Sequence, residues 1–236
     1  MIAICTLAWN SVDVTEEWAR SVDRNSGGHD IRLFVMDNGS TDDGATERCL
    51  WPLGRFWRNE VNESIYKGWN TVLREALLHR PEMIVLTNND VVVGPGWLDA
   101  ALREIRTGEK RYFLPHGDRF GTSTPEDFDR EVRRRAGSPT APRTVPARAG
   151  WCLIFPREAI EHFLPIPEEL VLWHGDDVIH DRLAAAGYRC EAITDCHVYH
   201  HVSVSFYKRD DYPTIVERDK QVYARLQREA KERTPC

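Results

Sequence analysis

The chain has 236 residues, of which 42% are hydrophobic and 29% charged, a balance typical of a globular protein with one sizeable core. Its 31 basic and 37 acidic side chains give a formal charge of −6, which argues against non-specific nucleic-acid binding by the molecule as a whole. The sequence contains no run of roughly 20 apolar residues, as a membrane-spanning helix requires, and no signal-peptide pattern follows Met1, so we expect a cytoplasmic location. The six cysteines stand singly, which disfavours a structural zinc site or a disulfide scaffold.

Short runs rich in β-branched residues alternate with amphipathic segments in the first 90 residues. The runs 2–7, 31–36 and 83–86 predict buried strands, because each is apolar and is soon followed by Gly, Asn or Asp. The segments 14–22 and 64–78 have helical spacing, and Ser64 is placed to cap the second. This alternation predicts an α/β fold with a parallel sheet covered by helices on both faces.

The second half of the chain is less regular. Residues 117–149 contain many Gly and Pro residues, which predict a long loop excursion with a short helix from Pro125 to Arg135. The other predicted elements are a helix at 96–105, a strand at 111–114, a strand at 151–155, a helix at 176–186, an extended segment at 189–202 and a helix at 216–231.

Polar residues follow three of the predicted strands, at the sheet edge where α/β proteins bind ligands. Asp37 is followed by turn residues, and this composition fits either a plain turn or a carboxylate that binds ribose hydroxyls or a base edge. The cluster Asn88–Asn89–Asp90 fits either a strand-ending turn or a set of oxygen ligands for a hard divalent cation.

Two further clusters lie in the second half. Asp176 and Asp177 open a predicted helix, where carboxylates complement the helix dipole or act as a general base. His197, His200 and His201 fit either a surface cluster or a metal ligand.

Taken in chain order, these pieces resemble the family 2 glycosyltransferases of GT-A fold. The matching pieces are Asn10 after the first strand, D-N-G-S-T-D at 37–42, residues 62–70 around Gly68, L-T-N-N-D at 86–90 with P-G-W-L at 95–98, G-W-C-L-I-F at 150–155, D-D-V-I-H-D-R-L-A-A-A-G-Y at 176–188 and V-Y-H-H at 198–201. The resemblance covers residues 1–205 and implies one GT-A, Rossmann-like domain with a mostly parallel central sheet flanked by helices. Its nucleotide-sugar half would be 1–95 and its acceptor half 96–205, with the excursion 117–149, followed by a helical extension at 206–236.

The resemblance also implies roles for individual residues. Asp90 and His200 would hold Mn²⁺ or Mg²⁺ on the donor diphosphate, and Gly150 and Trp151 would line the sugar site. The nucleotide-binding residues would be Thr6, Asn10, Asp37, Asn38, Lys67 and Asn89. The family's E-D base motif is replaced here by Asp176–Asp177. Counting from Arg182 and Gly187 favours Asp176 as the base, whereas aligning G-D-D with G-E-D favours Asp177, and the choice stays open.

The implied reaction is the inverting, metal-dependent transfer of a sugar from a nucleoside-diphosphate sugar, with UDP or GDP expected first, to an acceptor hydroxyl. The metal would neutralise the departing diphosphate, and a carboxylate would deprotonate the acceptor. A sugar-nucleotide pyrophosphorylase, a nucleotidyltransferase, is an alternative, although residues 6–10 lack the Gly-rich loop expected of it. A non-catalytic carbohydrate-binding protein is another, although it has no need for both Asp90 and Asp176.

Six arginines and one acidic residue lie between 130 and 148, a local charge of about +5 in an acidic protein. We therefore expect Arg133, Arg134 and Arg135 to face an anionic acceptor, such as nucleic acid with hydroxymethylated bases, a lipid-linked saccharide or an anionic glycan. The alternative is a solvated loop that pairs with its own acidic residues Glu126, Asp127 and Asp129.

Overall fold

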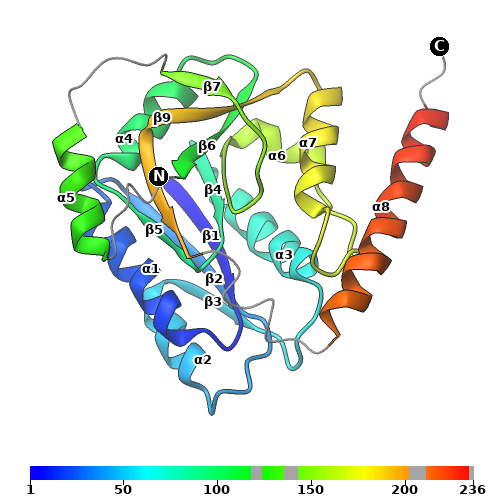
Figure 1. The fold of residues 1–236 in the computed structure, drawn as a ribbon, viewed down its shortest axis with the longest axis horizontal. Coiled ribbons are helices and arrows are strands. Elements are labelled where there is room, and N and C mark those ends of the chain that lie inside the picture. Colours follow the sequence, from blue (N-terminus) through cyan, green and yellow to red (C-terminus); the bar gives the residue numbers. More distant parts are fainter. Residues whose placement is uncertain (118–123, 136–142, 202–210, 234–236) are drawn as a thin grey trace.

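The computed structural model describes residues 1–117, 124–135, 143–201 and 211–233. Within these ranges, nine strands form one sheet in the order β3-β2-β1-β4-β8-β6-β9-β5, and β7 pairs with β9 (Figure 1). The strands are β1 Ile2–Ala8, β2 Ile31–Asp37, β3 Arg55–Arg58, β4 Met83–Thr87, β5 Val91–Val93, β6 Arg111–Gly117, β7 Thr144–Pro146, β8 Cys152–Pro156 and β9 Arg189–His200. The helices are α1 Val12–Asn25, α2 Ala45–Leu50, α3 Ile65–Leu77, α4 Trp97–Ile105, α5 Pro125–Arg135, α6 Ile160–Phe163, α7 Gly175–Ala185 and α8 Tyr212–Arg233.

The two halves of the sheet differ in strand direction. Strands β1 to β4 run parallel to one another, as the alternation of strands and helices predicts. Beyond them, β8 is antiparallel to both β4 and β6, β6 is parallel to β9, and β5 and β7 are antiparallel to β9. The predicted α/β domain with helices on its sheet is confirmed, and its second half is a mixed sheet.

Alternate side chains of the strands pack into two hydrophobic clusters, one on each face of the sheet. Ala3 and Cys5 of β1 pack with α3, α6 and α7, whereas Ile2 and Ile4 pack with α1, α2 and α4. The buried β-branched strands predicted from the sequence are therefore central strands covered on both faces.

The predicted elements of the first half agree with the structure within a few residues. Helix 64–78 is α3, and the side chain of Ser64 accepts a hydrogen bond from the Tyr66 N–H as expected of an N-cap. The short elements β3, β5, α2 and α6 were not predicted. Within the predicted excursion, α5 has the predicted bounds, and β7 adds a strand that was expected to be loop; residues 118–123 and 136–142 of the excursion lie outside the described residues.

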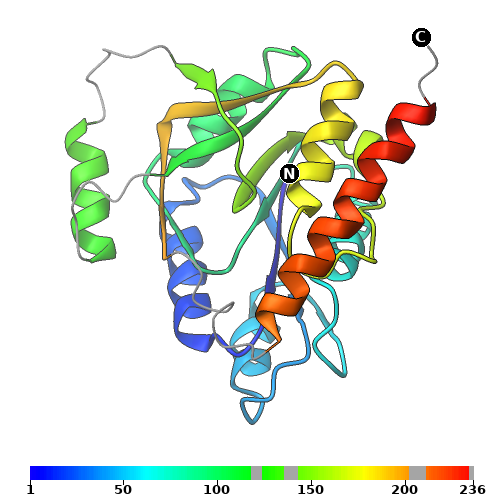
Figure 2. The same ribbon diagram turned by 45° about the vertical axis from the view of Figure 1, so that its right-hand side comes forward.

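Helix α8 is the longest helix, and its C-terminal half stands away from the body of the molecule (Figures 1 and 2). It begins four residues before the predicted start at 216. None of the helices in the described part of the chain is long and apolar enough to cross a membrane.

Candidate functional site

The loops that follow β1 and β2 are joined by hydrogen bonds. The Asn10 N–H donates to Ser40 Oγ at 2.9 Å, and Asn10 Oδ1 accepts from the Thr41 N–H at 2.7 Å. Asn10 has a φ of +48°, a left-handed conformation that Asn tolerates better than most residues. The parallel pairing of the two strands thus brings two of the predicted polar clusters to one edge, as expected.

Asp37 ends β2 with no exposed surface. Its Oδ1 accepts from the Ser40 N–H at 2.9 Å, whereas Oδ2 has no hydrogen-bond partner among the described residues and lies 3.6 Å from Arg58 Nε. The following Gly39 has a φ of +75°, and a Cβ there would lie 2.2 Å from the Val61 carbonyl carbon, so this tight turn requires glycine. A buried carboxylate oxygen with spare accepting capacity suits a hydroxyl or N–H donor of a ligand.

Three other residues predicted to bind the nucleotide use polar groups within the protein. The hydroxyl of Thr6, which is fully buried, donates to the Thr87 carbonyl oxygen at 2.8 Å. Asn89 Nδ2 donates to hydroxyls of α1 and the residue before it, and the Asn38 side chain bonds to the segment 59–63. Lys67 lies on the first turn of α3, with its ammonium group 2.6 Å from Glu63. In this structure Thr6, Asn38 and Asn89 hold the strand-end loops in place.

Asp90 and His200 lie together, as predicted. Residue Val91 of β5 pairs with His200 of β9, which brings His200 Nε2 to 3.3 Å from Asp90 Oδ1. The Asp90 side chain is only 8% exposed, and its Oδ1 has no hydrogen-bond partner among the described residues. A buried carboxylate oxygen beside an imidazole nitrogen fits a divalent metal ion. Among the described residues, no third His, Cys, Asp or Glu joins them to form a larger group of metal-binding side chains.

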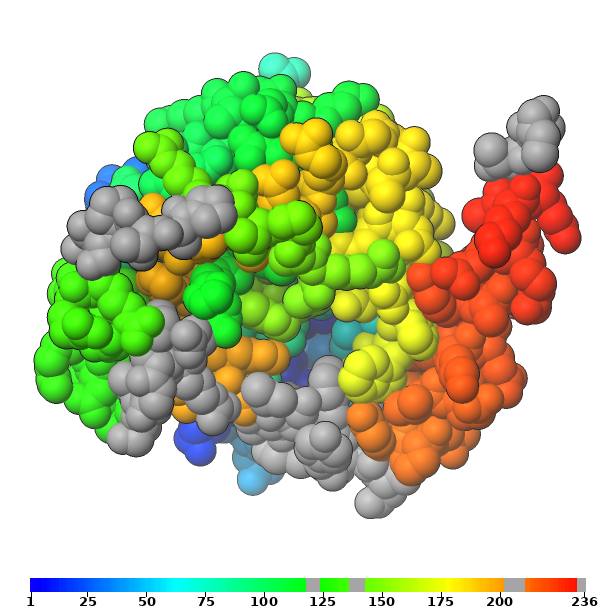
Figure 3. Space-filling view, turned by 45° about the horizontal axis from the view of Figure 1, so that its top comes forward, coloured from blue at the N-terminus to red at the C-terminus, as the bar shows by residue number. Residues whose placement is uncertain are grey.

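Gly150 and Trp151 connect this pair to α7. The Trp151 ring stacks on His200, with centroids 5.4 Å apart and an interplanar angle of 21°. A Cβ on Gly150 would lie 2.3 Å from Asp176 Oδ2, so only glycine lets the backbone approach this carboxylate so closely. Figure 3 shows a hollow between β9, which carries His200, and the segment before α7, with blue and teal atoms of the first half of the chain at its floor.

The two aspartates that open α7 have different surroundings. Burial raises the pKa of Asp176, the neighbouring charge of Asp177 raises it further, and Asp176 forms no ion pair with a described residue. Burial also acts on Asp177, but its Oδ2 lies 2.8 Å from His174 Nδ1 and its Oδ1 accepts from Arg148 at 2.9 Å, and these contacts lower its pKa. Asp176 is therefore the carboxylate with the raised pKa and no ion-pair partner among the described residues, whereas Asp177 is held by Arg148 and His174.

His180 of α7 holds the backbone of Ala149, which precedes the Gly150 that lies beside Asp176. It is buried, its Nε2 donates to the Ala149 carbonyl oxygen at 3.1 Å, and its Nδ1 accepts from the Tyr112 hydroxyl. Burial, and then the charge of Arg148, lower the pKa of His180, so that the neutral ring keeps both hydrogen bonds at neutral pH.

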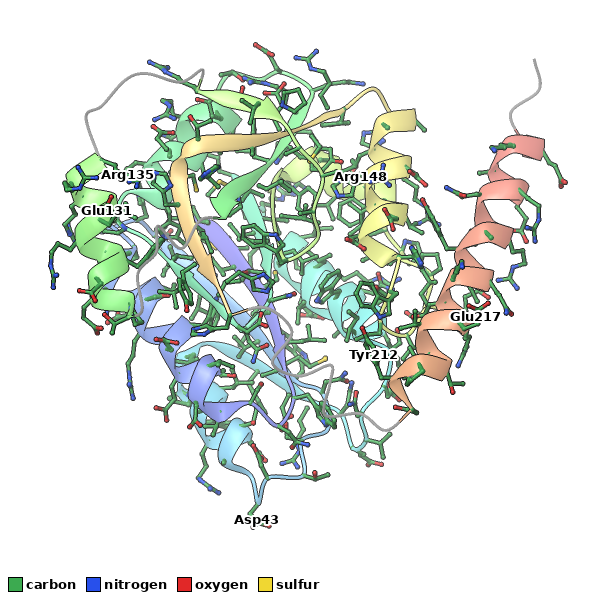
Figure 4. All side chains as sticks on the ribbon, viewed as in Figure 1. Asp43, Glu131, Arg135, Arg148, Tyr212 and Glu217 are labelled. Atoms are coloured by element: carbon green, nitrogen blue, oxygen red, sulfur yellow. The ribbon has the colours of Figure 1, made fainter. Side chains whose placement is uncertain are left out.

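The arginines of α5 lie elsewhere. Figure 4 shows Arg135 and Glu131 at the outer margin of α5, on the opposite side of the molecule from Arg148 and α7. Arg134 and Arg135 both donate to Glu131, and Arg130 donates to Asp127. The structure thus does not bring Arg133, Arg134 or Arg135 to the hollow, and most of the described charge of α5 is paired on the helix itself.

Sequence reasoning missed the residues that distinguish Asp176 from Asp177. Arg148 was counted with the excursion, but it bridges Asp177 and Asp181 of α7. His174 directly precedes the G-D-D motif, and its contact with Asp177 needs a left-handed φ of +67° that no local pattern indicates. The only signal in the sequence for this contact is that His174 directly precedes the G-D-D motif.

Solved structures with a similar fold are glycosyltransferases. GalNAc-T7, solved with UDP, GalNAc and Mn²⁺, has a TM-score of 0.65 and 16% identity over 85% of this chain and 43% of its own. TarS of S. aureus has a TM-score of 0.63 and 17% identity, and the match covers 86% of this chain and 37% of TarS. The TarS fragment 1–349 has a TM-score of 0.60 and 15% identity, and the match covers 84% of this chain and 60% of the fragment. This chain therefore spans less than two thirds of each of these neighbours. No curated protein matches it significantly.

These neighbours share the GT-A fold and confirm the predicted architecture. The model of the family described as glycosyl transferase family 2 matches residues 3–164, more than half of the chain. The chain therefore belongs to glycosyltransferase family 2.

Proposed function

We propose that the protein is an inverting, metal-dependent glycosyltransferase that uses a nucleoside-diphosphate sugar, with a UDP-sugar as the first candidate donor. The observation that carries the proposal is the pair of Asp90 and His200, in which a buried carboxylate oxygen without a hydrogen-bond partner lies 3.3 Å from an imidazole nitrogen. The neighbour GalNAc-T7, solved with UDP and Mn²⁺, supports the choice of donor and of Mn²⁺ over Mg²⁺.

In the proposed reaction, Asp90 and His200 would hold the metal ion, and a bound ion would supply positive charge beside the departing diphosphate. Asp37 accepts a hydrogen bond from the base or ribose with its Oδ2, which has no hydrogen-bond partner among the described residues. Trp151, held against His200, and Gly150 line the donor sugar.

Asp176 is proposed as the general base that takes the proton of the acceptor hydroxyl. Its raised pKa favours proton uptake, and Asp177 is held by Arg148 and His174 instead. Attack by the activated hydroxyl from the face opposite the diphosphate inverts the anomeric carbon, and an NMR assignment of the product's anomeric configuration tests this outcome.

The acceptor is proposed at the level of its charge. Arg133 is exposed and forms no ion pair with a described residue, and the exposed pairs of Arg134 and Arg135 are weak enough to exchange for phosphate or carboxylate groups. Because α5 lies apart from α7, an anionic acceptor that uses both needs to be extended, as a glycan or a nucleic acid is.

Replacing Asp90 with Ala tests the metal assignment. We expect release of nucleoside diphosphate from UDP-sugars in Mn²⁺ to fall at least about a hundredfold, since a Lewis acid contributes several kcal/mol to such a step. Asp43→Ala in the exposed turn before α2 is the matched control and should behave as wild type (Figure 4). Retained turnover in Asp90→Ala would remove Asp90 from the metal site.

A further inference from the structure

A buried carboxylate on α8 binds the loop that leads into α7. Asp219 has no exposed surface, and its two oxygens accept from the N–H groups of three consecutive residues, Val171, Leu172 and Trp173, at 2.7–3.1 Å. Asp219 forms no ion pair with any Lys or Arg that the structure describes, so these backbone donors are what compensate its buried charge. The loop conformation and the carboxylate therefore depend on each other.

One helical turn further on, Tyr223 contacts both sides of the α7 N-terminus. Its ring stacks on His174 with centroids 4.8 Å apart and an interplanar angle of 4°, and its hydroxyl donates to Asp181 Oδ2 at 2.6 Å. His174 in turn contacts Asp177, and Asp181 shares Arg148 with Asp177. The contacts of Tyr223 thus reach the groups that hold Asp177, the residue next to Asp176 in the first turn of α7.

Helix α3 holds the same loop from the other side. The Ile65 N–H donates to the Val171 carbonyl oxygen at 3.0 Å, and Ser64 Oγ donates to the Leu170 carbonyl oxygen. The loop ends at His174, whose left-handed backbone is uncommon for a residue other than Gly and persists where neighbours fix it. The segment before Asp176 is therefore clamped between α3 and α8.

The contacts of α8 are concentrated on this segment. Among its apolar residues Ile215 is buried, while Val222, Tyr223 and Leu226 are only partly buried against the core, and its last turns stand away from the body (Figures 1 and 2). The family 2 model ends at residue 164, so it describes neither the loop nor α8.

We propose that Asp219 and Tyr223 of α8 are positioning residues that hold the segment 170–174 and the first turn of α7, so that the Asp176 carboxylate faces Gly150. This inference rests on the proposed role of Asp176 as the base. It assigns the C-terminal helix a part in the chemical step, where the sequence indicated an extension outside the transferase domain.

The test uses the full chain with Asp219→Asn, Tyr223→Phe and Tyr223→Leu. The probes are UDP-GalNAc and UDP-glucose with Mn²⁺, with UDP release as the kinetic readout and calorimetric binding of UDP and Mn²⁺ as the second. We expect kcat to fall about tenfold or more in Asp219→Asn and Tyr223→Leu and a few-fold in Tyr223→Phe, because small misplacements of a reacting group are costly. The KM for the donor and the affinity for UDP should stay within about twofold of wild type.

Glu217→Gln, on the exposed side of α8, is the matched control and should leave both readouts unchanged (Figure 4). Unchanged kcat in the α8 variants, or an equal loss of kcat and of UDP affinity, would overturn the positioning role. If Asp219→Asn does not fold, the two Tyr223 variants decide by the same criteria. Asp176→Asn separates the two proposals: full UDP release in this variant defeats the base assignment, whereas its loss together with unaffected α8 variants defeats only the positioning role.

Discussion

Adjacent aspartates at the start of α7 have opposite electrostatic surroundings. The sequence left Asp176 and Asp177 as equal candidates for the base, because the two possible alignments of the motif disagree. The difference between them comes from Arg148 and His174, which reach Asp177 through tertiary contacts and a left-handed backbone. Local sequence carries no record of such contacts, so the identity of the base could not be predicted from the motif alone.

Replacing each aspartate with Asn should therefore give different results. Asp176→Asn should lower kcat for sugar transfer by about 10²–10⁴-fold with little change in donor affinity, as the loss of a general base does. Asp177→Asn should retain most of the activity and lower stability by roughly 0.5–1 kcal/mol, the value of a partly exposed ion pair. Steady-state kinetics and thermal unfolding check both, and a greater loss of kcat in Asp177→Asn would reverse the assignment.

The dependence of stability on pH should also differ between the two positions. Asp176 has a raised pKa, so its ionisation destabilises the fold as pH rises from the ordinary carboxyl range through the raised value, and Asp176→Asn should raise Tm at neutral pH. Asp177 has a lowered pKa, so its stabilising effect is present above the ordinary carboxyl range and is lost as pH falls through the lowered value.

Thermal unfolding of the wild type and both variants between neutral and acid pH measures these effects. The increase in Tm caused by Asp176→Asn and the decrease in Tm caused by Asp177→Asn should both become smaller as pH falls. A Tm for Asp176→Asn below that of wild type at neutral pH would contradict the unfavourable burial of this charge.

At the scale of elements, the strongly periodic segments were predictable and the short ones were not. The predictable elements are apolar strands or helices with one buried face, namely strands β1, β2 and β4 and helices α1 and α3. Strands β5 and β7 have three residues each and exist because β9 supplies hydrogen-bond partners from the other end of the chain. Such pairing depends on tertiary structure, which explains why β7 was expected to be loop.

Helix α5 was predicted with the right bounds, but its position was not predictable. Phe128 and Val132 bury its inner face near Gly94, and Arg24 of α1 pairs with Asp129, which holds the helix at the β5 side of the sheet. The arginines therefore lie on an outer flank, while charge alone had indicated an acceptor site.

Replacing Arg133, Arg134 and Arg135 together with Ala should leave UDP release by donor hydrolysis within about twofold of wild type. The same variant should weaken use of an anionic acceptor, because the substitutions remove three positive charges from this flank. Lys220→Ala on α8 controls for loss of surface charge. If acceptor kinetics are unchanged, the flank is a solvated helix face with no role in acceptor binding.

For the whole molecule, the sequence predicted which residues gather at the sheet edge better than what each one does there. Asp37 and Asp90 follow β2 and β4, which both pair in parallel with β1 and so bring their ends to one edge. His200 reaches Asp90 through the antiparallel pairing of β5 with β9, and Gly150 lies close to Asp176. Thr6 and Asn89 face inward and bind other parts of the protein instead.

Ligand binding should stabilise the whole domain. With UDP and Mn²⁺ at about 100 times the dissociation constant, we expect about 2.7 kcal/mol of added stability and a rise in Tm of roughly 5–10 °C. In thermal-shift measurements, Asp37→Asn should reduce the rise in Tm caused by UDP. Asp90→Ala should reduce the part of the rise in Tm that depends on Mn²⁺. Equal shifts in wild type and both variants would place the nucleotide elsewhere.

The pairing of β5 with β9 makes the proposed metal site a reporter of correct folding. Asp90 and His200 stand far apart in sequence and meet only in the register that places Val91 opposite His200. A slip of one residue would turn His200 to the other face of the sheet and separate the pair. High-affinity metal binding should therefore appear late in refolding, after β5 and β9 have paired, and partly folded chains should bind Mn²⁺ no better than unfolded ones.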